Sequence, residues 1–132
     1  MIQDLEALRT ELFVAAKRAA SRAYAPYSNF FVGAAAMTTT GVFVSGCNVE
    51  NASYGLTLCA ECGLVSDLIV SHAGAITHVV VCSPTGELIS PCGRCRQLLL
   101  EHAAPGAMFA TTDGWDAIAN LLPGYFSAED LR

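Results

Sequence analysis

The sequence predicts an α/β fold of three layers, in which a mixed sheet of about five strands carries helices on both faces. Helical and extended patterns alternate along the chain in the order α-β-β-α-β-α-β. The run AITHVVVCS (75–83) is apolar and rich in β-branched residues, as expected of a central strand buried on both faces. No repeat, low-complexity segment or internal linker interrupts the 132 residues, so we expect one domain, 1–132.

The first half of the chain predicts a helix followed by a hairpin. Leucine and alanine recur at steps of three and four residues over 5–23, which indicates a helix with one apolar face. Pro26 disfavours the helical conformation at the residue before it, so we expect the helix to end near there. The apolar runs FFVGAAAM (30–37) and GVFVSGCNV (41–49) then predict a hairpin that turns at Gly41.

The second half of the chain predicts two more helices and at least two more strands. A helical pattern covers 58–74, and a third helix is predicted for CGRCRQLLLEH (92–102). The segment AMFATT (107–112) favours a strand, whereas WDAIANLL (115–122) fits a strand, a helix or one after the other. The final segment, 123–132, predicts an irregular tail with a last helical turn.

The composition excludes two classes of partner. The net charge is −5 and the seven Lys and Arg residues are scattered, which argues against nucleic acid binding. The apolar runs are too short for a membrane span, and the acidic N-terminal stretch does not resemble a secretory signal, so we expect a cytoplasmic protein. With 53% hydrophobic and only 14% charged residues, either some apolar surface is buried against another subunit or the core is alanine-rich.

Six cysteines give the strongest functional signal. Their even number permits three disulfides, but a chain without signs of secretion favours metal ligands, catalytic groups or buried thiols. Cys59 and Cys92 are each predicted at the start of a helix, where free N–H groups and the helix dipole favour the thiolate. Three ligands from these two helix starts, Cys59, Cys92 and Cys95, would leave a fourth zinc position open, which is typical of catalytic zinc.

Glu61 adds a carboxylate to this pattern. It lies about 200° around the helix from Cys59, so we do not expect a ligand there, but from the first turn it can move protons at the open position. The segments C-A-E (59–61) and P-C-x-x-C (91–95) match the arrangement of zinc deaminases, with Cys in place of His. The alternative is a closed, structural four-cysteine site that includes Cys62; the helical character of LCAECGLV and the long gap between the pairs disfavour it.

Over nearly its whole length the chain resembles the homotetrameric, zinc-dependent cytidine deaminases. The stretches that carry the resemblance are YAPYSNFFVGAA (24–35), GCNVENASYG (46–55), CAE (59–61), PCGRCRQLL (91–99) and LLPGYF (121–126). The resemblance implies hydrolysis of cytidine and 2′-deoxycytidine to uridine and 2′-deoxyuridine plus ammonia, in pyrimidine salvage, with one zinc ion per subunit. Deaminases of cytosine-nucleoside antibiotics of the blasticidin kind also resemble PCGRCRQLLLE and are the alternative enzyme, but NVEN and LLPGYF favour plain nucleosides.

The resemblance also implies roles for individual residues. Cys59, Cys92 and Cys95 would hold zinc, and Glu61 would shuttle protons. The substrate would be held by Asn48 and Glu50 at a ribose hydroxyl, by Phe30 against the pyrimidine and by the backbone near Ala60. Residues that would reach into a neighbouring subunit's pocket, so that a homotetramer shares its active sites, are Ala52, Tyr54 and Phe126. Without the resemblance, Phe30 and Phe126 would be interpreted as core aromatics and Tyr54 as a loop anchor.

Two features of the residues themselves bear on these roles. Asn48 and Glu50 lie two apart at a strand end, so they point to the same side, and a buried amide beside a carboxylate needs a polar partner. The family commonly has arginine after C-A-E, where this chain has Cys62. Three thiolates weaken zinc as a Lewis acid, and we expect Arg94, together with the helix N-termini, to offset their charge.

Overall fold

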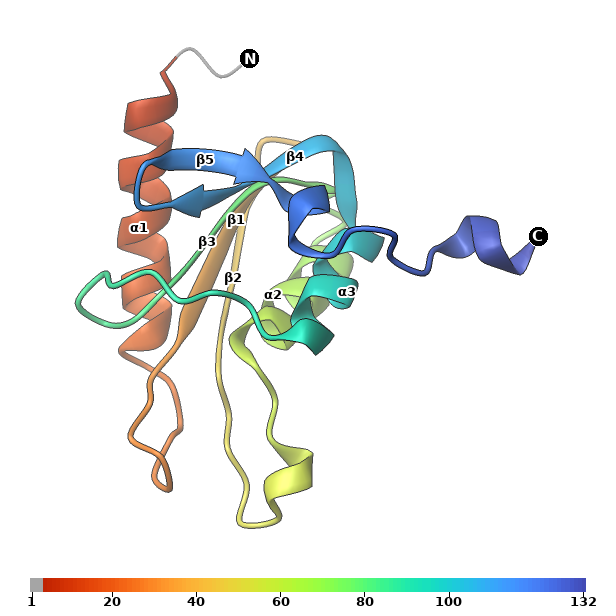
Figure 1. The fold of residues 1–132 in the computed structure, drawn as a ribbon. Coiled ribbons are helices and arrows are strands. Elements are labelled where there is room, and N and C mark those ends of the chain that lie inside the picture. Colours follow the sequence, from red (N-terminus) through yellow and green to blue (C-terminus); the bar gives the residue numbers. More distant parts are fainter. Residues whose placement is uncertain (1–3) are drawn as a thin grey trace.

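The computed structural model describes residues 4–132 and has the three layers that the sequence predicts (Figure 1). One helix, α1 (Leu5–Ala20), covers one face of a five-stranded sheet. The other face carries α2 (Ala60–Val70) and α3 (Gly93–Glu101). Residues 1–3 of the predicted domain lie outside the described residues.

The sheet is mixed, with the strand order β2-β1-β3-β4-β5. The strand β3 lies at its centre, antiparallel to β1 and parallel to β4, and the outer pairs β1–β2 and β4–β5 are antiparallel hairpins. Four of the seven residues of β3 in an unbroken run are buried, which confirms the predicted central strand. The strands are β1 (Gly33–Thr38), β2 (Phe43–Cys47), β3 (Ile76–Cys82), β4 (Ala103–Thr111) and β5 (Gly114–Ala117).

The first helix ends at Ala20, three residues before the end of the apolar pattern at 23. The backbone of Tyr24 explains the difference, because its N–H donates to the carbonyl of Asn48 over 3.0 Å and its carbonyl accepts from the N–H of Glu50 over 2.8 Å. A residue that pairs with the strand end in this way cannot also continue a helix. The segment after α1 therefore lies beside residues 48–50.

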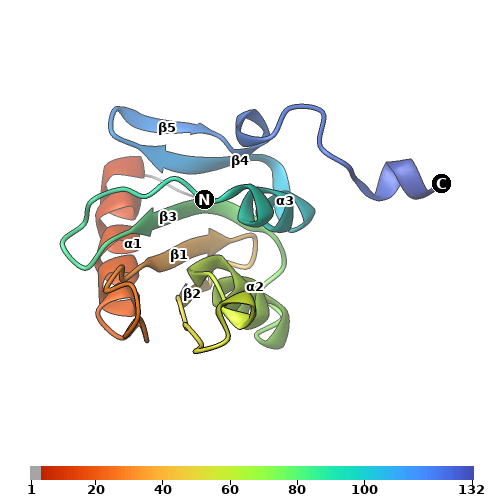
Figure 2. The ribbon, with the colours of Figure 1, turned by 60° about the horizontal axis from the view of Figure 1, so that its bottom comes forward.

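The structure shows the conformation of residues 115–122, for which the sequence permits a strand, a helix or both. Residues 115–122 begin in β5 and continue in a short 3₁₀ helix, Ile118–Leu121, so the chain is first extended and then helical. The strand β4 begins at Ala103, four residues before the prediction. The tail leaves the body of the domain and ends in the predicted helical turn, Ala128–Leu131 (Figures 1 and 2).

Each helical layer packs on its own apolar cluster. Leu8, Leu12 and Ala16 of α1 contact one face of the sheet, where Val80 and Cys82 are buried. A larger cluster fills the space under α2 and α3 and includes Leu64, Leu68, Val79, Val81 and Leu99. None of the helices in the described part of the chain is both long and apolar enough to cross a membrane.

Close contact between α2 and the sheet depends on Gly46 in β2. A Cβ atom at this position would lie 2.4 Å from the carbonyl oxygen of Ala60 and 2.4 Å from the nitrogen of Leu64. Only glycine lets the first turns of α2 approach the strand so closely. Because α2 and α3 cover the same face of the sheet, their N-terminal ends meet beside it (Figure 2).

Candidate active site

Three cysteines come together where α2 and α3 begin. Cys59 is the N-cap of α2 and Cys92 the N-cap of α3, both with extended backbone, and Cys95 lies in the first turn of α3. Their three sulfurs lie within 4.8 Å of one another, and those of Cys59 and Cys92 are 3.9 Å apart. The structure thus brings together the three cysteines that the sequence singles out as ligands.

The spacing of the sulfurs fits a zinc ion. In a tetrahedral site with Zn–S bonds of about 2.3 Å, two sulfurs are about 3.8 Å apart, whereas a disulfide holds them at about 2.05 Å. None of the three cysteines forms a disulfide, and their burial differs: Cys92 is exposed, Cys59 is half-buried and Cys95 is buried. One side of the cluster is therefore open, as a site with a free coordination position requires.

The protonation of the cysteines also favours a cation. Burial, and then the charge of neighbouring groups, raises the pKa of Cys59, and burial followed by the charge of Glu61 raises that of Cys95. The pKa of Cys92 is lowered, chiefly by the backbone N–H of Cys95. Three thiolates this close repel one another, and a divalent cation among them removes that cost.

Cys62 does not belong to this cluster. Its sulfur accepts a hydrogen bond from Nη2 of Arg94 over 2.8 Å, and the metal-binding group formed by the described residues contains only Cys59, Cys92 and Cys95. The alternative of a closed four-cysteine site therefore finds no support in the geometry. Arg94 lies beside the cluster as expected, but its hydrogen bond goes to Cys62 and not to one of the clustered sulfurs.

Glu61 is the acidic group of the site and is almost fully buried, with 3% of its surface exposed. Burial raises the pKa of its carboxyl group, while hydrogen bonds from its own backbone N–H and from Cys95, and the charge of Arg94, oppose the shift. A carboxyl group whose pKa is moved toward neutrality is suited to accept and return a proton at neutral pH.

A cavity of about 220 Å³ joins these groups. Ala60, Glu61 and the exposed side of the cysteine cluster form one part of its wall, and Phe30 and Asn48 another. Five further residues of the wall escape sequence reasoning, because hydrophobic or hydroxyl residues in loops and strands carry no local signal of a binding site. They are Val32, Thr57, Val81, Ile89 and Ser90.

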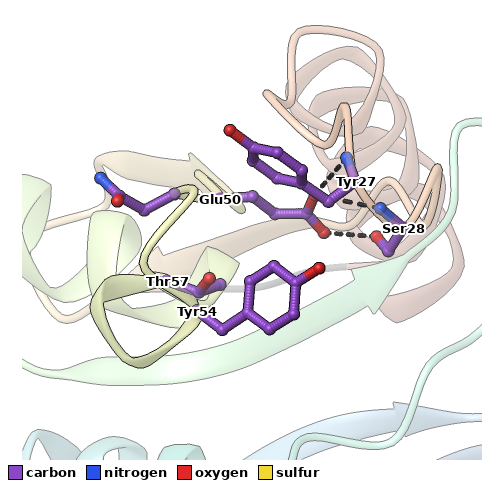
Figure 3. Close-up of a pocket in the computed structure, with 6 residues that line it drawn as sticks. Tyr27, Ser28, Glu50, Tyr54 and Thr57 are labelled. Carbon is purple, nitrogen blue, oxygen red and sulfur yellow. Dashed lines mark hydrogen bonds between the residues drawn. The ribbon is translucent and has the colours of Figure 1, made fainter.

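Asn48 and Glu50 serve two adjoining pockets. Asn48 is buried at the cavity wall, where its amide donates to the carbonyl of Phe30 over 2.8 Å and accepts from the N–H of Val32 over 2.9 Å. Glu50 is only half-buried and lines a neighbouring pocket of about 280 Å³ together with Tyr27, Ser28, Asn51, Tyr54 and Thr57 (Figure 3). Thr57 lines both pockets, so they are contiguous.

The aromatic side chains predicted to contact the substrate or a neighbouring subunit are exposed in the single chain. Phe30 is 57% exposed, Tyr54 76% and Phe126 58%, so the interpretation of Phe30 and Phe126 as core aromatics is wrong. The ring of Tyr54 lies 6.0 Å from that of Tyr27 at the rim of the second pocket. Phe126 lies in the projecting tail, where Nε2 of Gln97 donates to its carbonyl over 2.7 Å. Ala52 is exposed in the loop before Tyr54.

Comparison with known proteins agrees with this geometry. Residues 7–111 match the family model of the cytidine and deoxycytidylate deaminase zinc-binding region. The chain is 46% identical over 116 residues to a cytidine deaminase from Mycobacterium tuberculosis, a match that covers 88% of this chain and 87% of that protein. A cytidine deaminase from Sporosarcina psychrophila is 38% identical over 127 residues, with 92% and 93% covered.

Solved structures give the same result. The crystal structure of cytidine deaminase from Mycobacterium tuberculosis superimposes with a TM-score of 0.86 at 44% identity, covering 89% of this chain and 96% of that one. The crystal structure of cytidine deaminase from Mycobacterium leprae superimposes with a TM-score of 0.83 at 46% identity, covering 87% and 97%.

Proposed function

The chain belongs to the cytidine and deoxycytidylate deaminase family, and from this premise we propose that it hydrolyses cytidine and 2′-deoxycytidine to uridine and 2′-deoxyuridine. Water replaces the exocyclic amine at C4 of the base, and ammonia leaves. The observation that carries the proposal is the buried carboxyl group of Glu61 in one cavity with Cys59 and Cys92. From this reaction we infer a role in pyrimidine salvage.

The metal of the site is zinc, held by Cys59, Cys92 and Cys95, one ion per subunit. Zinc bound there supplies a Lewis acid that lowers the pKa of water to near neutrality, so that a nucleophile is available at pH 7. The N-terminal ends of α2 and α3 contribute partial positive charge that stabilises the thiolates. Arg94 adds a full positive charge beside them.

Glu61 moves the protons of the reaction. Its carboxylate accepts a proton from the attacking water and gives it to N3 of the pyrimidine, and it later carries the second proton of that water to the leaving amine. The raised pKa of Glu61 supports this role, because a carboxyl group that holds its proton more strongly is better suited to take a proton up and pass it on. Its burial limits the access of bulk water to the carboxyl group.

The remaining cavity residues hold the nucleoside. We assign the face of the pyrimidine to the ring of Phe30, its edge to the backbone at Ala60, and a sugar hydroxyl to Asn48 and Glu50. The two adjoining pockets support this division, because the cavity with the cysteines suits the base and the pocket of Glu50 suits the sugar. Asn48 and Glu50 already have hydrogen-bond partners within the chain, so a sugar hydroxyl would bind to the donor and acceptor positions that these partners leave open.

We further propose a homotetramer whose active sites are shared, in which Ala52, Tyr54 and Phe126 complete a neighbouring subunit's pocket. The exposure of Tyr54 and Phe126 and the projecting tail support the proposal, because apolar side chains in such positions gain from burial against another chain. Light scattering after gel filtration tests it: a mass of one subunit would contradict it.

We also propose that 1–132 is one domain, because both apolar clusters share one sheet. We propose that the protein works in the cytoplasm, where its thiols stay reduced.

The decisive experiment is an assay of ammonia release from cytidine by the zinc-loaded chain, followed also by the loss of ultraviolet absorbance as cytidine becomes uridine. We expect steady turnover that a zinc chelator abolishes and added zinc restores. Blasticidin-type antibiotics serve as comparison substrates. A zinc-loaded, folded chain that releases no ammonia from cytidine or 2′-deoxycytidine would overturn the proposal.

A further inference from the structure

The carboxylate of Glu50 is held in place by three donors from one turn of the chain (Figure 3). Oε1 accepts from the N–H of Tyr27 over 2.9 Å and from the N–H of Ser28 over 3.2 Å. Oε2 accepts from the hydroxyl of Ser28. The Ser28 hydroxyl first, and then the two backbone N–H groups, lower the pKa of Glu50 against the opposing effect of burial. The group is therefore an ionised acceptor at neutral pH.

Ser28 also accepts a hydrogen bond besides the one that it donates to Glu50. Since an ionised carboxylate only accepts, the Ser28 hydroxyl must donate to it, and its oxygen remains free to accept. The N–H of Phe30 donates to this oxygen over 3.0 Å. The turn that makes both contacts possible contains Asn29 with φ of 57°, a left-handed conformation that asparagine tolerates better than most residues.

The same network continues to the second sugar-binding candidate. The carbonyl of Phe30 accepts from Nδ2 of Asn48 over 2.8 Å. The backbone of Phe30 is therefore hydrogen-bonded to Asn48 through its carbonyl and to Ser28 through its N–H. One connected path of hydrogen bonds thus runs from Glu50 through Ser28 and Phe30 to Asn48. It links the pocket of Glu50 with the cavity that contains the cysteines.

We propose that Ser28 is a positioning residue for substrate binding: it orients the Glu50 carboxylate toward a sugar hydroxyl and fixes that carboxylate relative to Asn48 through the backbone of Phe30. The inference rests on the proposed function, because it assigns the orienting partner of residues that the proposal places at the sugar. Ser28 itself need not touch the substrate.

The contacts also limit what Glu50 can bind. A carboxylate has about four lone-pair positions, and Tyr27 and Ser28 occupy both positions of Oε1 and one of Oε2. One position on Oε2 remains, which is enough for a single hydroxyl donor. If Ser28 is removed, Oε2 can turn and bind water, and the hydroxyl of the substrate loses its oriented acceptor.

The test compares Ser28→Ala with the wild type on cytidine and on 2′,3′-dideoxycytidine, which lacks the ring hydroxyls. We expect kcat/KM for cytidine to fall about tenfold, mainly through a higher KM, as for one weakened hydrogen bond to substrate. The value for 2′,3′-dideoxycytidine should change less than twofold. Ser28→Thr keeps a hydroxyl and should restore cytidine turnover, and the loss caused by Ser28→Ala should vanish in a Glu50→Ala background.

Two controls make the outcome decisive. Ser53→Ala alters an exposed serine near the same pocket whose hydroxyl makes no hydrogen bond among residues 4–132, and it should leave both substrates unaffected. If the alanine variant is unstable, Ser28→Cys takes its place, because a thiol has nearly the shape of the hydroxyl but is a much weaker donor. It should also lose activity on cytidine and keep it on 2′,3′-dideoxycytidine. Equal losses on both nucleosides, or a full loss that persists in Glu50→Ala, would overturn the inference alone. A wild type inactive on cytidine and 2′-deoxycytidine would overturn the proposed function and the inference with it.

Discussion

Arg94 donates a hydrogen bond from Nη2 to the sulfur of Cys62 over 2.8 Å, which joins the first turn of α3 to the first turn of α2. In the chain Arg94 lies between Cys92 and Cys95, so its charge lies beside the cysteine cluster although its hydrogen bond goes elsewhere. The pKa of Arg94 is raised first by Cys62 and then by the charge of Cys59. The guanidinium therefore acts on the clustered thiolates through its charge, with Cys62 as its anchor.

Removing the charge of Arg94 should slow the reaction without removing zinc. Arg94→Gln leaves the three thiolates less compensated, so zinc becomes a weaker Lewis acid, and we expect kcat to fall at least tenfold. Cys62→Ala is the matched variant, because it removes the anchor and keeps the charge, and it should have the smaller effect. Steady-state kinetics on zinc-loaded protein measure both. Unchanged turnover in Arg94→Gln would refute the role.

The two cysteines of the segment CAEC differ in their expected effect on zinc. Cys59→Ala removes one of the three clustered sulfurs, and we expect the purified protein to bind zinc at least tenfold more weakly. Cys62→Ala should keep one zinc ion per subunit. Atomic absorption combined with competition by a chromogenic chelator gives stoichiometry and affinity. Loss of zinc from Cys62→Ala would revive the four-cysteine site.

Glu61→Gln should separate chemistry from metal binding. The amide has nearly the shape of the carboxyl group but neither accepts nor returns a proton, so we expect kcat to fall by about 10²–10⁴-fold. Zinc content and the thermal transition should stay close to those of the wild type, because Glu61 is not among the clustered ligands. Zinc analysis and calorimetry provide these controls. A variant that keeps most of its activity would exclude Glu61 as the proton carrier.

The positions of the site cysteines could be predicted because local signals mark them. Cys59 and Cys92 each follow a loop and precede a helical pattern, and the helix N-caps lie at these residues. The central strand β3 was likewise predictable, since its apolar run contains β-branched residues that favour a strand over a helix.

Features that depend on contacts between distant segments could not be predicted in this way. The end of α1 at Ala20 depends on the pairing of Tyr24 with residues 48–50, which no local pattern reveals. The sequence places the charge of Arg94 beside the clustered thiolates but does not identify its hydrogen-bond partner, Cys62, which lies on the neighbouring helix. The contacts of Ser28 depend on the turn at Asn29, which brings Ser28 to Glu50 across 22 residues of sequence.

The buried thiol of Cys82 should make stability depend on alkaline pH. Burial raises its pKa from 9.0 to about 11, with a small opposing effect of Lys17. Between these values the unfolded chain loses the proton and the folded chain keeps it, so this contribution to stability is fully present below pH 9 and is lost as the pH rises toward 11. At pH 10 the loss is about 1 kcal/mol.

Denaturant unfolding of the wild type and Cys82→Ala at pH 7.5 and pH 10 measures this contribution. The alanine variant is less stable at both values because it leaves a cavity, but the difference between the two proteins should shrink by about 1 kcal/mol at pH 10. Other groups that titrate in this range affect both proteins and cancel. A difference that does not change with pH would show that Cys82 is not the group responsible.

Gly46→Ala should disturb the cysteine cluster, because it pushes the start of α2 away from the sheet. The new Cβ would meet the carbonyl of Ala60 and the nitrogen of Leu64 at 2.4 Å, and both atoms are backbone that cannot rotate away. Because α2 must then move off the sheet, Cys59 shifts relative to Cys92 and Cys95. We expect a loss of about 1–3 kcal/mol in the free energy of unfolding and weaker zinc binding. Gly55→Ala is the control, since its Cβ meets no atom within 4 Å. Chemical denaturation and chelator competition measure both effects, and a Gly46→Ala protein that binds zinc like the wild type would show that the helix start is not held by this contact.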